Sequence, residues 1–429
     1  MPTMRNKTTI RLFWLTLPIF VTSLSVSAAA LRYTGVNLAG AEFGQTSLPG
    51  VYNTHYTYPT QAEVDYFRSK GMNVIRLPFR WERLQQTANA SFNTAEFNRL
   101  NAFVSATTAK GVTVILDPHN FARYYPDPGN YESSSQGLVG SDVPNSVFSN
   151  FWFRVADVYR TNGCVIFNLV NEPNSMPTEQ WVCAANASIA AIRTTRATNL
   201  ILVPGNAWTG AWTWDQNWYG TPNAQAMLNI VDPGNNYAYD VHQYLDSNGS
   251  GGSTNIVSPT IGAERLAGFT QWLRNNSRKG FLGEFAVANS TVGTGIGDEA
   301  ISNLLTHVEA NADVWLGWAW WAAGPWWGNY MFTLEPANLV NPTDLPAMNI
   351  LESYIPIPAP TLELAPGTQF RFVAQAGFVY DAEASANISV GSWTNYGGAI
   401  VGSGQTATVT MQAGASQRGF YRVRVDRAP

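Results

Sequence analysis

The chain has 429 residues and a formal net charge of −4; 45% of its residues are hydrophobic and only 13% are charged, against a usual charged share of about 25%. This length and apolar content fit one large domain followed by a smaller one. Because the acidic balance leaves no excess of basic side chains to neutralise phosphates, we exclude nucleic acid as a partner.

The amino terminus has the three parts of a secretory signal peptide. Three basic residues within the first eleven precede the apolar run LFWLTLPIFVTSLSV, and the small residues SAAA follow it at positions 27–30. The apolar run is shorter than the roughly 20 residues of a membrane span. We therefore expect residues 1–30 to be removed by cleavage near Ala28 or Ala30, and the mature protein to be secreted without a membrane anchor.

Eight short apolar runs follow, each separated from the next by an amphipathic stretch. They are Tyr33–Gly40, Met72–Phe79, Val112–His119, Cys164–Glu172, Asn199–Asn206, Tyr237–Tyr244, Gly280–Phe285 and Val314–Trp321. Apolar runs separated by helices indicate a parallel sheet that is buried on both faces. Eight repeats over residues 31–354 predict an α/β fold, a (β/α)₈ TIM barrel, whose functional residues gather at the carboxyl ends of the strands.

An open, doubly wound sheet is the alternative arrangement, and it usually has a glycine-rich phosphate loop after its first strand. The first run here continues as GAEFG (40–44), a weak match to such a loop. The helical stretches have apolar residues at three- and four-residue spacing, and two of them reach a glycine, Gly111 and Gly280, that fits a helix C-cap. The barrel is therefore the predicted fold.

The chain has two cysteines, Cys164 in the fourth run and Cys183 in the helix expected after it. In an exported protein these residues could form a disulfide, and two separate thiols fit the sequence nearly as well. Their spacing does not fit a zinc site.

Polar and aromatic residues stand at the carboxyl ends of the runs. They are Arg76, Asp117, His119, Asn120, Asn171, Glu172, His242, Tyr244, Glu284, Trp320 and Trp321. Each residue alone fits a structural role, such as a helix cap, a salt bridge or a buried histidine. Together they predict a functional site, because capping does not require two carboxylates, two histidines, an arginine and tryptophans at one end of a barrel.

Two glutamates on different strands, Glu172 and Glu284, suit glycoside hydrolysis. One carboxylic acid protonates the leaving oxygen, while the other attacks the sugar or activates water. Neighbouring groups can keep one carboxyl protonated and the other ionised near neutrality. The loops after the fifth run, which includes Trp208, and after the eighth run are rich in tryptophan, and their flat faces can stack on sugar rings.

A metal-dependent hydrolase is the rival enzyme class. Its oxygen and nitrogen ligands would be Asp117, His119, His242 and Glu172. The first run supplies only GVN, without a pair of histidines, and the whole chain has four histidines. We therefore expect no metal and no organic cofactor.

The motifs at these strand ends are similar to those of glycoside hydrolase family five, in particular its endo-β-1,4-glucanase branch. The motifs are GAEFG, NVIRLPF around Arg76, LDPHNFARYY around His119 and Asn120, NEP at 171–173, VPGNAWTGAWTW after the fifth run, VHQY with His242 and Tyr244, GEF at 283–285 and WWAAGPWWGNY from Trp320. They span about residues 33–336 in family order. NEP or GEF alone would be weak, but the set is specific.

The resemblance implies that Glu172 is the general acid/base and Glu284 the nucleophile of a retaining double displacement. Eight further residues are expected to bind the substrate or orient the carboxylates: Arg76, His119, Asn120, Asn171, His242, Tyr244, Trp208 and Trp321. Among these, Asn171 would bind the sugar 2-hydroxyl. Trp321 is preferred to Trp320 as the floor of the subsite, although alternation along a strand says only that one of them faces inward.

The pattern changes after residue 354. Prolines spaced through residues 355–366 predict a short, stiff linker, and residues 367–429 alternate in short runs, as in a small antiparallel β-sandwich. Trp393, Tyr396 and Tyr380 are expected in the core of this all-β module, with an exposed glycan-binding face as the alternative.

These patterns predict a secreted, monomeric endo-β-1,4-glucanase whose partner is a polysaccharide, cellulose or a related glucan. The same catalytic residues would serve on mannan, xyloglucan or mixed-linkage glucan, and the sequence does not discriminate these substrates well. A glycan-binding barrel that does not hydrolyse its ligand is the hypothesis from another class. The presence of both glutamates argues against it.

Overall fold

The computed structural model describes residues 30–125, 136–357, 360, 362–365, 369–385, 393–410 and 420–427. The predicted signal peptide lies outside this part of the chain, apart from its last residue. Within the described ranges, no helix combines the length and the apolar character that crossing a membrane requires.

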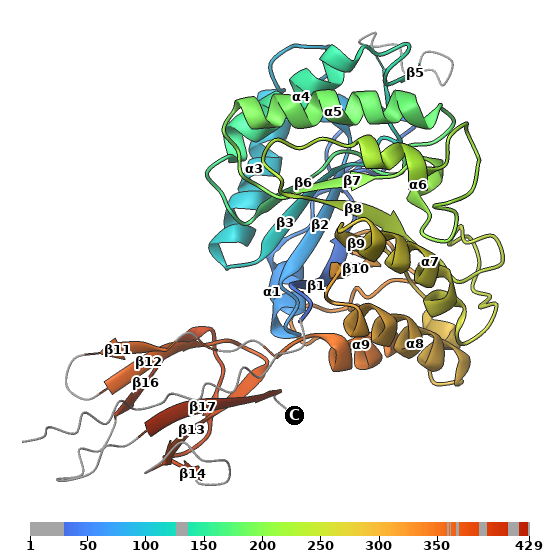
Figure 1. The fold of residues 1–429 in the computed structure, drawn as a ribbon. Helices are drawn as coiled ribbons and strands as arrows, with labels where there is room; N and C mark the ends of the chain where they lie inside the picture. The colour runs from blue at the N-terminus through green and yellow to red at the C-terminus, as the bar shows by residue number, and fades with distance from the viewer. Residues whose placement is uncertain are drawn as a thin grey trace, which may run out of the picture.

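Eight parallel strands close into a barrel, as predicted (Figure 1). Their bounds are β1 Tyr33–Leu38, β2 Val74–Phe79, β3 Thr113–Pro118, β6 Val165–Asn168, β7 Ile201–Pro204, β8 Tyr237–His242, β9 Gly280–Glu284 and β10 Trp315–Ala323. Strand β1 pairs with β2 on one side and with β10 on the other, so the sheet has no free edge. This closure excludes the doubly wound alternative.

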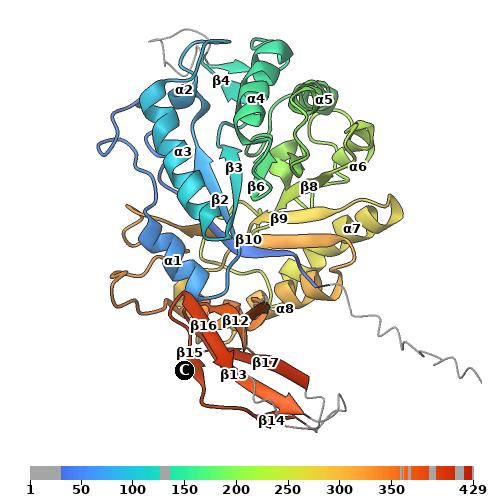
Figure 2. The same cartoon turned by 90° about the vertical axis from the view of Figure 1, so that its left-hand side faces the viewer.

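Helices surround the barrel and connect successive strands (Figure 2). The α-helices are α1 Gln61–Ser69, α2 Trp81–Leu84, α3 Thr94–Ala109, α4 Asn145–Tyr159, α5 Thr178–Thr194, α6 Asn223–Ala226, α7 Ile261–Asn275, α8 Ile296–Ala310 and α9 Pro346–Leu351. Single 3₁₀ turns are η2 Ala207–Thr209, η3 Met227–Asn229, η4 Asn289–Thr291 and η5 Glu352–Tyr354, and a small ribbon joins β4 Arg123–Tyr124 to β5 Gly137–Leu138.

A layer of buried apolar side chains takes one residue from each barrel strand. These residues are Tyr33, Val74, Ile115, Ile166, Leu202, Ala238, Phe281 and Ala319. Because side chains alternate along a strand, the residue two positions further on points to the same side. Arg76, Asp117 and Asp240 each stand two residues after a member of this layer and are fully buried. The strands therefore carry polar side chains next to the apolar layer, toward their carboxyl ends.

Buried tryptophans attach the helices to the barrel. The Trp152 indole on α4 donates to the backbone oxygen of Leu169 at 3.0 Å, and the Trp181 indole on α5 donates to that of Pro204 at 2.7 Å. Each ring thus buries a large apolar area while its N–H group keeps a partner. Much of the aromatic content of this chain serves packing in this way.

The fourth barrel strand is shorter than its apolar run predicts. Strand β6 ends at Asn168, and Glu172 follows in a turn with a left-handed backbone (φ 44°). The run misleads because the turn residues Leu169 and Val170 are themselves buried. The question of the two cysteines is also answered, since Cys164 and Cys183 are free thiols.

The two expected glycine caps have different outcomes. Gly111 follows α3 with φ 78°, as a left-handed C-cap position requires. Gly280 does not cap α7, which ends at Asn275, and Ser277 takes a left-handed conformation instead (φ 52°). Gly280 is the first residue of β9, where an added Cβ would lie 2.7 Å from the Leu273 side chain.

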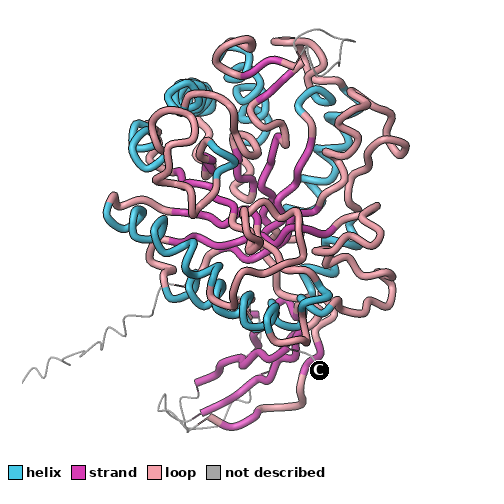
Figure 3. Tube along the Cα trace, turned by 90° about the vertical axis from the view of Figure 1, so that its right-hand side faces the viewer, coloured by secondary structure: helices cyan, strands magenta, loops and turns pink. Residues whose placement is uncertain are grey.

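The C-terminal strands lie next to α1 (Figures 1 and 2) and outside the ring of helices (Figure 3). They are β11 Glu363–Ala365, β12 Gln369–Ala374, β13 Phe378–Ser385, β14 Thr394–Asn395, β15 Ile400–Val401, β16 Gln405–Thr410 and β17 Phe420–Arg427. Strand β12 pairs with β11 and β16, and β13 pairs with β14, β15 and β17, all antiparallel. The additional all-β part is therefore present, as predicted.

Two details of this part differ from expectation. Strand β11 occupies residues that the proline spacing assigned to the linker. The strand pairs with β12 through its backbone, and such pairing leaves no side-chain pattern in the sequence. Tyr380 and Tyr396 join the core as expected, but Trp393 does not, and the Arg422 guanidinium lies 4.4 Å from its ring centre. The side chain of Gln375 donates to the backbone oxygen of Arg68 at the end of α1 (2.7 Å), which connects the two parts.

The contact between β1 and β2 gives a test of the barrel. Gly35 lies opposite Val74, and a Cβ on Gly35 would stand 1.8 Å from the Val74 backbone oxygen. We expect Gly35→Ala to lower the free energy of unfolding by about 3 kcal/mol, the upper part of the usual overpacking cost. Gly163→Ala is the control, because nothing lies within 4 Å of its added carbon. Thermal unfolding followed by tryptophan fluorescence measures both variants, and equal midpoints would contradict the prediction.

Candidate active site

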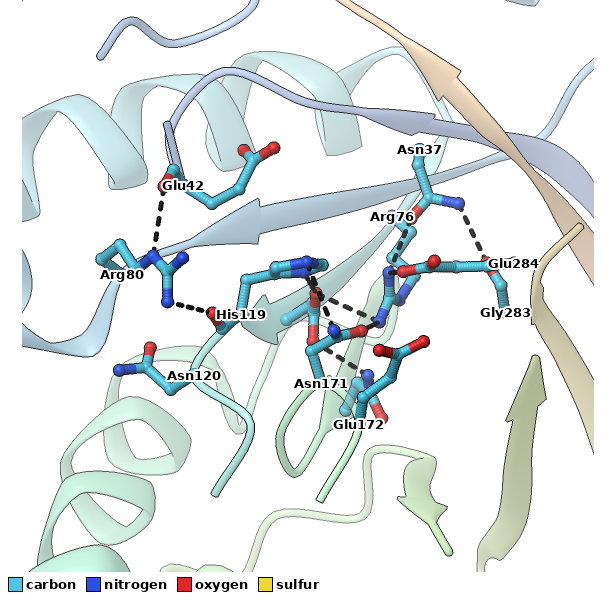
Figure 4. A network of polar contacts seen from close by, with 12 residues as sticks. Asn37, Glu42, Arg76, Arg80, His119, Asn120, Asn171, Glu172, Gly283 and Glu284 are labelled. Atoms are coloured by element: carbon cyan, nitrogen blue, oxygen red, sulfur yellow. Dashed lines mark hydrogen bonds and ion pairs between the residues drawn. The ribbon is translucent and has the colours of Figure 1, made fainter. Parts of the chain in front are cut away.

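A buried arginine lies at the centre of the polar groups (Figure 4). The Arg76 guanidinium on β2 has no exposed surface; its Nη1 donates to Asn37 Oδ1 and to Glu284 Oε1, both at 2.8 Å. Its Nη2 donates to Asn171 Oδ1 at 2.7 Å and lies 3.1 Å from Asp117 Oδ2. Burial opposes the charge of Arg76, but Asp117 and Glu284 outweigh that effect and raise its pKa. Arg76 therefore joins residues from five parts of the barrel rim.

Glu284, the last residue of β9, is held by two donors. Arg76 binds its Oε1, and the Tyr244 hydroxyl donates to its Oε2 at 2.8 Å. Burial raises the pKa of Glu284, while the charges of His242 and Arg76 counteract that rise. Burial and the charge of Glu284 raise the pKa of Tyr244 well above its usual value, so this hydroxyl stays a donor. The two donors fix the carboxylate and stabilise its ionised form, while burial keeps the pKa of Glu284 above its usual value.

Glu172 faces Glu284 from the turn after β6. Its side chain is 17% exposed, and Asn174 Nδ2 donates to its backbone oxygen at 3.0 Å. This bond helps to hold a left-handed backbone, which costs energy for a residue other than glycine. One oxygen of each glutamate and a ring nitrogen of His242 lie within 4.8 Å of one another. The two carboxyl groups therefore face the same small space.

His242 connects the two glutamates. Its Nδ1 lies 2.6 Å from Glu172 Oε1 and 3.5 Å from Glu284 Oε2. Burial opposes protonation of this ring, but Glu284, Asp240 and Glu172 outweigh it and raise the pKa of His242 to about 10. The imidazole is therefore cationic at neutral pH and is placed beside two carboxylates.

His119 and Trp321 form a second wall of the site. Their rings stack with centres 5.4 Å apart and an angle of 18° between planes. His119 Nδ1 lies 2.9 Å from Asp117 Oδ2, and Nε2 lies 3.2 Å from Asn171 Nδ2. Because the Asn171 amide donates, Nε2 accepts and the ring proton stands on Nδ1, toward Asp117. Asn171 is thus held between His119 and Arg76.

The choice between the two neighbouring tryptophans is decided by burial. Trp320 has no exposed surface, and its indole donates to the backbone oxygen of Phe332 at 2.8 Å. Trp321 is partly exposed beside His119, and its indole donates to the Tyr330 hydroxyl at 3.1 Å. Trp321 therefore faces the site, as preferred.

Asn120 lies apart from this group, although it was expected to bind the substrate. Its side chain is 1% exposed; the amide donates to Glu82 Oε2 at 2.7 Å, and the carbonyl accepts from the Trp81 backbone at 2.9 Å. These bonds attach the loop after β3 to helix α2. The motif placed Asn120 next to His119 in sequence, but the chain turns between them.

A cleft of about 500 Å³ opens beside Glu172. Its walls include Phe121, Glu172, Trp208, Trp212, Trp218, His242, Tyr244 and Gly249. Trp208 is 41% exposed and Trp218 is 51% exposed. A rare left-handed turn, with positive φ at three successive residues from 207 to 209, presents the Trp208 ring. A hollow of about 290 Å³ lies next to His119 and Phe121 and is also lined by Glu42, Gln45 and Arg80.

A metal-dependent hydrolase would need Asp117, His119, His242 and Glu172 as ligands, and among the described residues these four do not form one cluster. Asp117 is engaged by Arg76, by His119 and by the Asn168 amide at 3.0 Å. Among the described residues, one acidic and histidine cluster has ligand-like spacing, Glu172 with His242 and Glu284. The Arg76 guanidinium already lies against Glu284, so cationic side chains already balance the negative charge of this cluster.

Two residues of the network were not assigned a role from the sequence. Asn37 on β1 binds Arg76 and donates to the backbone oxygen of Gly283 at 2.9 Å. Asp117 entered only as a strand-end residue and a possible ligand. A buried polar residue in an otherwise apolar strand run is the signal that marks both of them.

Comparison with known proteins is consistent with this geometry. The model of the cellulase family, glycosyl hydrolase family 5, matches residues 36–324. Endo-beta-1,4-glucanase A of Emericella nidulans is 42% identical over 315 residues, which are 73% of this chain and 89% of that protein. A solved endo-beta-1,4-glucanase from Xanthomonas axonopodis pv. citri is 44% identical, with a TM-score of 0.71 over 76% of this chain and 98% of that one.

A second solved structure, Pseudomonas stutzeri endoglucanase Cel5A in complex with cellobiose, is 31% identical, with a TM-score of 0.67 over 77% of this chain and 94% of that one. Residues 36–324, which the family model matches, contain every residue of the network around Arg76 and all of the barrel strands except the first three residues of β1. The chain belongs to the cellulase family, glycosyl hydrolase family 5.

Proposed function

We propose that this protein is a secreted endo-β-1,4-glucanase that hydrolyses internal bonds of cellulose or related glucans with retention of configuration. The separation of Glu172 and Glu284 carries the mechanism: one oxygen of each lies within 4.8 Å of the other. Retaining glycosidases hold their carboxyl groups about 5–5.5 Å apart, whereas inverting enzymes leave about 6.5–9.5 Å for a water molecule. The names of the relatives support the substrate class.

In the first step, Glu284 attacks the anomeric carbon and Glu172 gives its proton to the leaving glycosidic oxygen. The C–O bond breaks and a covalent glycosyl-enzyme forms on Glu284. Arg76 and Tyr244 hold the attacking carboxylate ionised and oriented, so little rearrangement is needed at the moment of attack.

In the second step, water attacks the same carbon from the side the leaving sugar vacated. Glu172, now a carboxylate, takes a proton from this water as general base, and the bond to Glu284 breaks. Two inversions at one carbon restore the original configuration. The chemistry uses the side chains and water, and it calls on no metal or organic cofactor.

Substrate binding is assigned to residues on both sides of the carboxylates. Among the described residues the Asn171 amide has one partner, His119. Its second hydrogen would bind the 2-hydroxyl of the reacting sugar, and Trp321 would form the floor of this subsite. Trp208 lies on the Glu172 side of the cleft, so it would stack on the sugars of the leaving chain. The contacts of Asn120 support a structural role instead.

We further propose that residues 1–30 are removed on secretion, that residues 31–354 act as a monomeric catalytic barrel, and that residues 367–429 form a separate module. The amino-terminal pattern supports the first point. The change from the barrel to two antiparallel sheets supports the last, with the linker now shortened by β11.

Replacement of the nucleophile tests the reaction and the substrate together. We expect the mature protein to release reducing sugars from carboxymethyl-cellulose faster than from mannan or xyloglucan. Glu284→Gln removes the attacking charge and should lower the rate more than about 10³-fold. Glu309→Gln, at an exposed site on α8, is the matched control. Activity on mannan or xyloglucan alone would overturn the substrate, and release from none of the three would favour a glycan-binding barrel.

The hydroxyl of Tyr244 gives a prediction about pH. A hydrogen bond to an ionised carboxylate lowers its pKa, so Tyr244→Phe should raise the pKa of Glu284. Because Glu284 acts as the base form, the acidic limb of the kcat/KM profile should move to higher pH, by about one unit. The control is Tyr219→Phe, since the Tyr219 hydroxyl lies 3.5 Å from Ser175 rather than on a carboxylate. An unchanged acidic limb would contradict this role of Tyr244.

Trp208 gives a prediction about the leaving chain. We expect Trp208→Ala to raise KM for cello-oligosaccharides about tenfold, which is the loss of roughly one aromatic stacking contact. Aryl β-cellobiosides leave only an aryl group on that side, so their kcat/KM should change less than about threefold. Trp326→Ala is the control, because Trp326 is 51% exposed but does not line the cleft beside Glu172. Equal effects on both substrates would remove Trp208 from this subsite.

A further inference from the structure

Asp240 is a buried carboxylate that the proposed reaction does not use. It lies on β8 between Ala238 of the apolar layer and His242, and it has no exposed surface. Within the part of the chain that the structure describes, neither of its carboxylate oxygens has a hydrogen-bond partner. An isolated charge in such a place is costly, and buried carboxylates normally have a cationic partner.

The cation nearest to Asp240 is the ring of His242. Asp240 Oδ2 lies 3.7 Å from His242 Nε2, the one ion pair of Asp240 among the described residues. His242 Nε2 likewise has no hydrogen-bond partner there. The two groups that lack partners thus face each other, and the opposite ring nitrogen lies 2.6 Å from Glu172 Oε1.

The chain leaves space for this carboxylate. A Cβ on Gly283 would lie 2.3 Å from Asp240 Oδ1, so only glycine fits beside it in β9. The other charged or titratable groups that face the Asp240–His242 pair come from all sides of the barrel mouth: Arg76, Asp117, Glu172, Tyr244 and Glu284. Arg76 is already shared among Glu284, Asn171, Asn37 and Asp117, which leaves His242 as the partner of Asp240.

We propose that Asp240 is a positioning residue that acts through His242 to keep a proton available to Glu172. With Asp240 ionised, His242 holds one proton on Nε2 toward Asp240 and shares the other between Nδ1 and Glu172 Oε1. Glu172 passes that shared proton to the leaving oxygen, and it recovers one when water attacks. Protons balance over the two steps and no further reactant is needed.

The kinetic part of this inference rests on the proposed function. Asp240→Asn removes a negative charge that favours the protonated pair, so the shared proton should be lost at lower pH. The alkaline limb of kcat should therefore move to lower pH by about one to two units, the usual effect of a charge at this distance. On the alkaline side of both limbs, kcat on phenyl β-cellobioside, which needs acid assistance, should therefore be about 10- to 100-fold lower in the variant than in the parent protein. On 2,4-dinitrophenyl β-cellobioside it should change less than about threefold.

A second readout is independent of activity. The chain has four histidines, so histidine labelled with ¹³C and ¹⁵N gives few NMR signals, and that of His242 is identified by its absence in His242→Gln. We expect the titration midpoint of His242 to be about one to two pH units lower in Asp240→Asn than in the parent protein. Asp232→Asn is the matched control. The Asp232 side chain is also buried, but its ion pair is with Arg193 and not with a residue of the active site. This substitution should lower stability and change neither the His242 signal nor the leaving-group dependence.

The outcomes separate the two proposals. If His242 titrates alike in the parent and in Asp240→Asn, or both cellobiosides lose activity equally, Asp240 is a structural residue and the inference is wrong. If His242 responds as expected but the parent protein hydrolyses no glycan, the effect of Asp240 on His242 is confirmed and the proposed function is wrong.

Discussion

The burial of one positive charge, Arg76, organises the mouth of this barrel. A guanidinium without contact to water requires partners for its N–H groups. The chain supplies partners for the two Nη atoms from three strands and one turn, and Nε has none among the described residues. Asn37, Asp117, Asn171 and Glu284 therefore take fixed positions relative to one another. Removing any one of them would take a partner from a buried N–H group of Arg76, so the position of Glu284 is tied to the stability of the rim.

The charges around this centre give the two glutamates different environments. Glu284 lies against a guanidinium and a phenol, which both stabilise its ionised form. Glu172 lies on a turn at the edge of the cleft and contacts the His242 ring instead. His242 in turn lies between Glu172 and the buried Asp240. The fold thus gives the proposed nucleophile and the proposed proton donor different partners: a guanidinium and a phenol for Glu284, and an imidazole for Glu172.

Strand alternation delivers these groups to one place. On β2, β3 and β8, the face that adds an apolar side chain to the layer carries a buried charged residue two positions later: Arg76, Asp117 and Asp240. Aromatic side chains differ in position: Trp152 and Trp181 are buried between helices and strands, Trp208 is exposed at the cleft, and Trp321 is partly exposed beside His119. The difference between packing and binding tryptophans is therefore one of position, since the chemistry of the side chain is the same.

The sequence by itself predicted the barrel, the C-terminal strands and the positions of both glutamates at strand ends. Eight apolar runs and the motifs at their ends are local patterns, and they can be recognised in the sequence alone. The sequence did not determine which polar residues meet. Asn37 and Glu284 lie far apart along the chain and touch only through the closed sheet, and Asn120 follows His119 directly yet turns away from it. Tertiary structure decided the choice of Trp321 over Trp320, the early end of β6 and the contact between Asp240 and His242. Burial and contact depend on elements that no local pattern brings together.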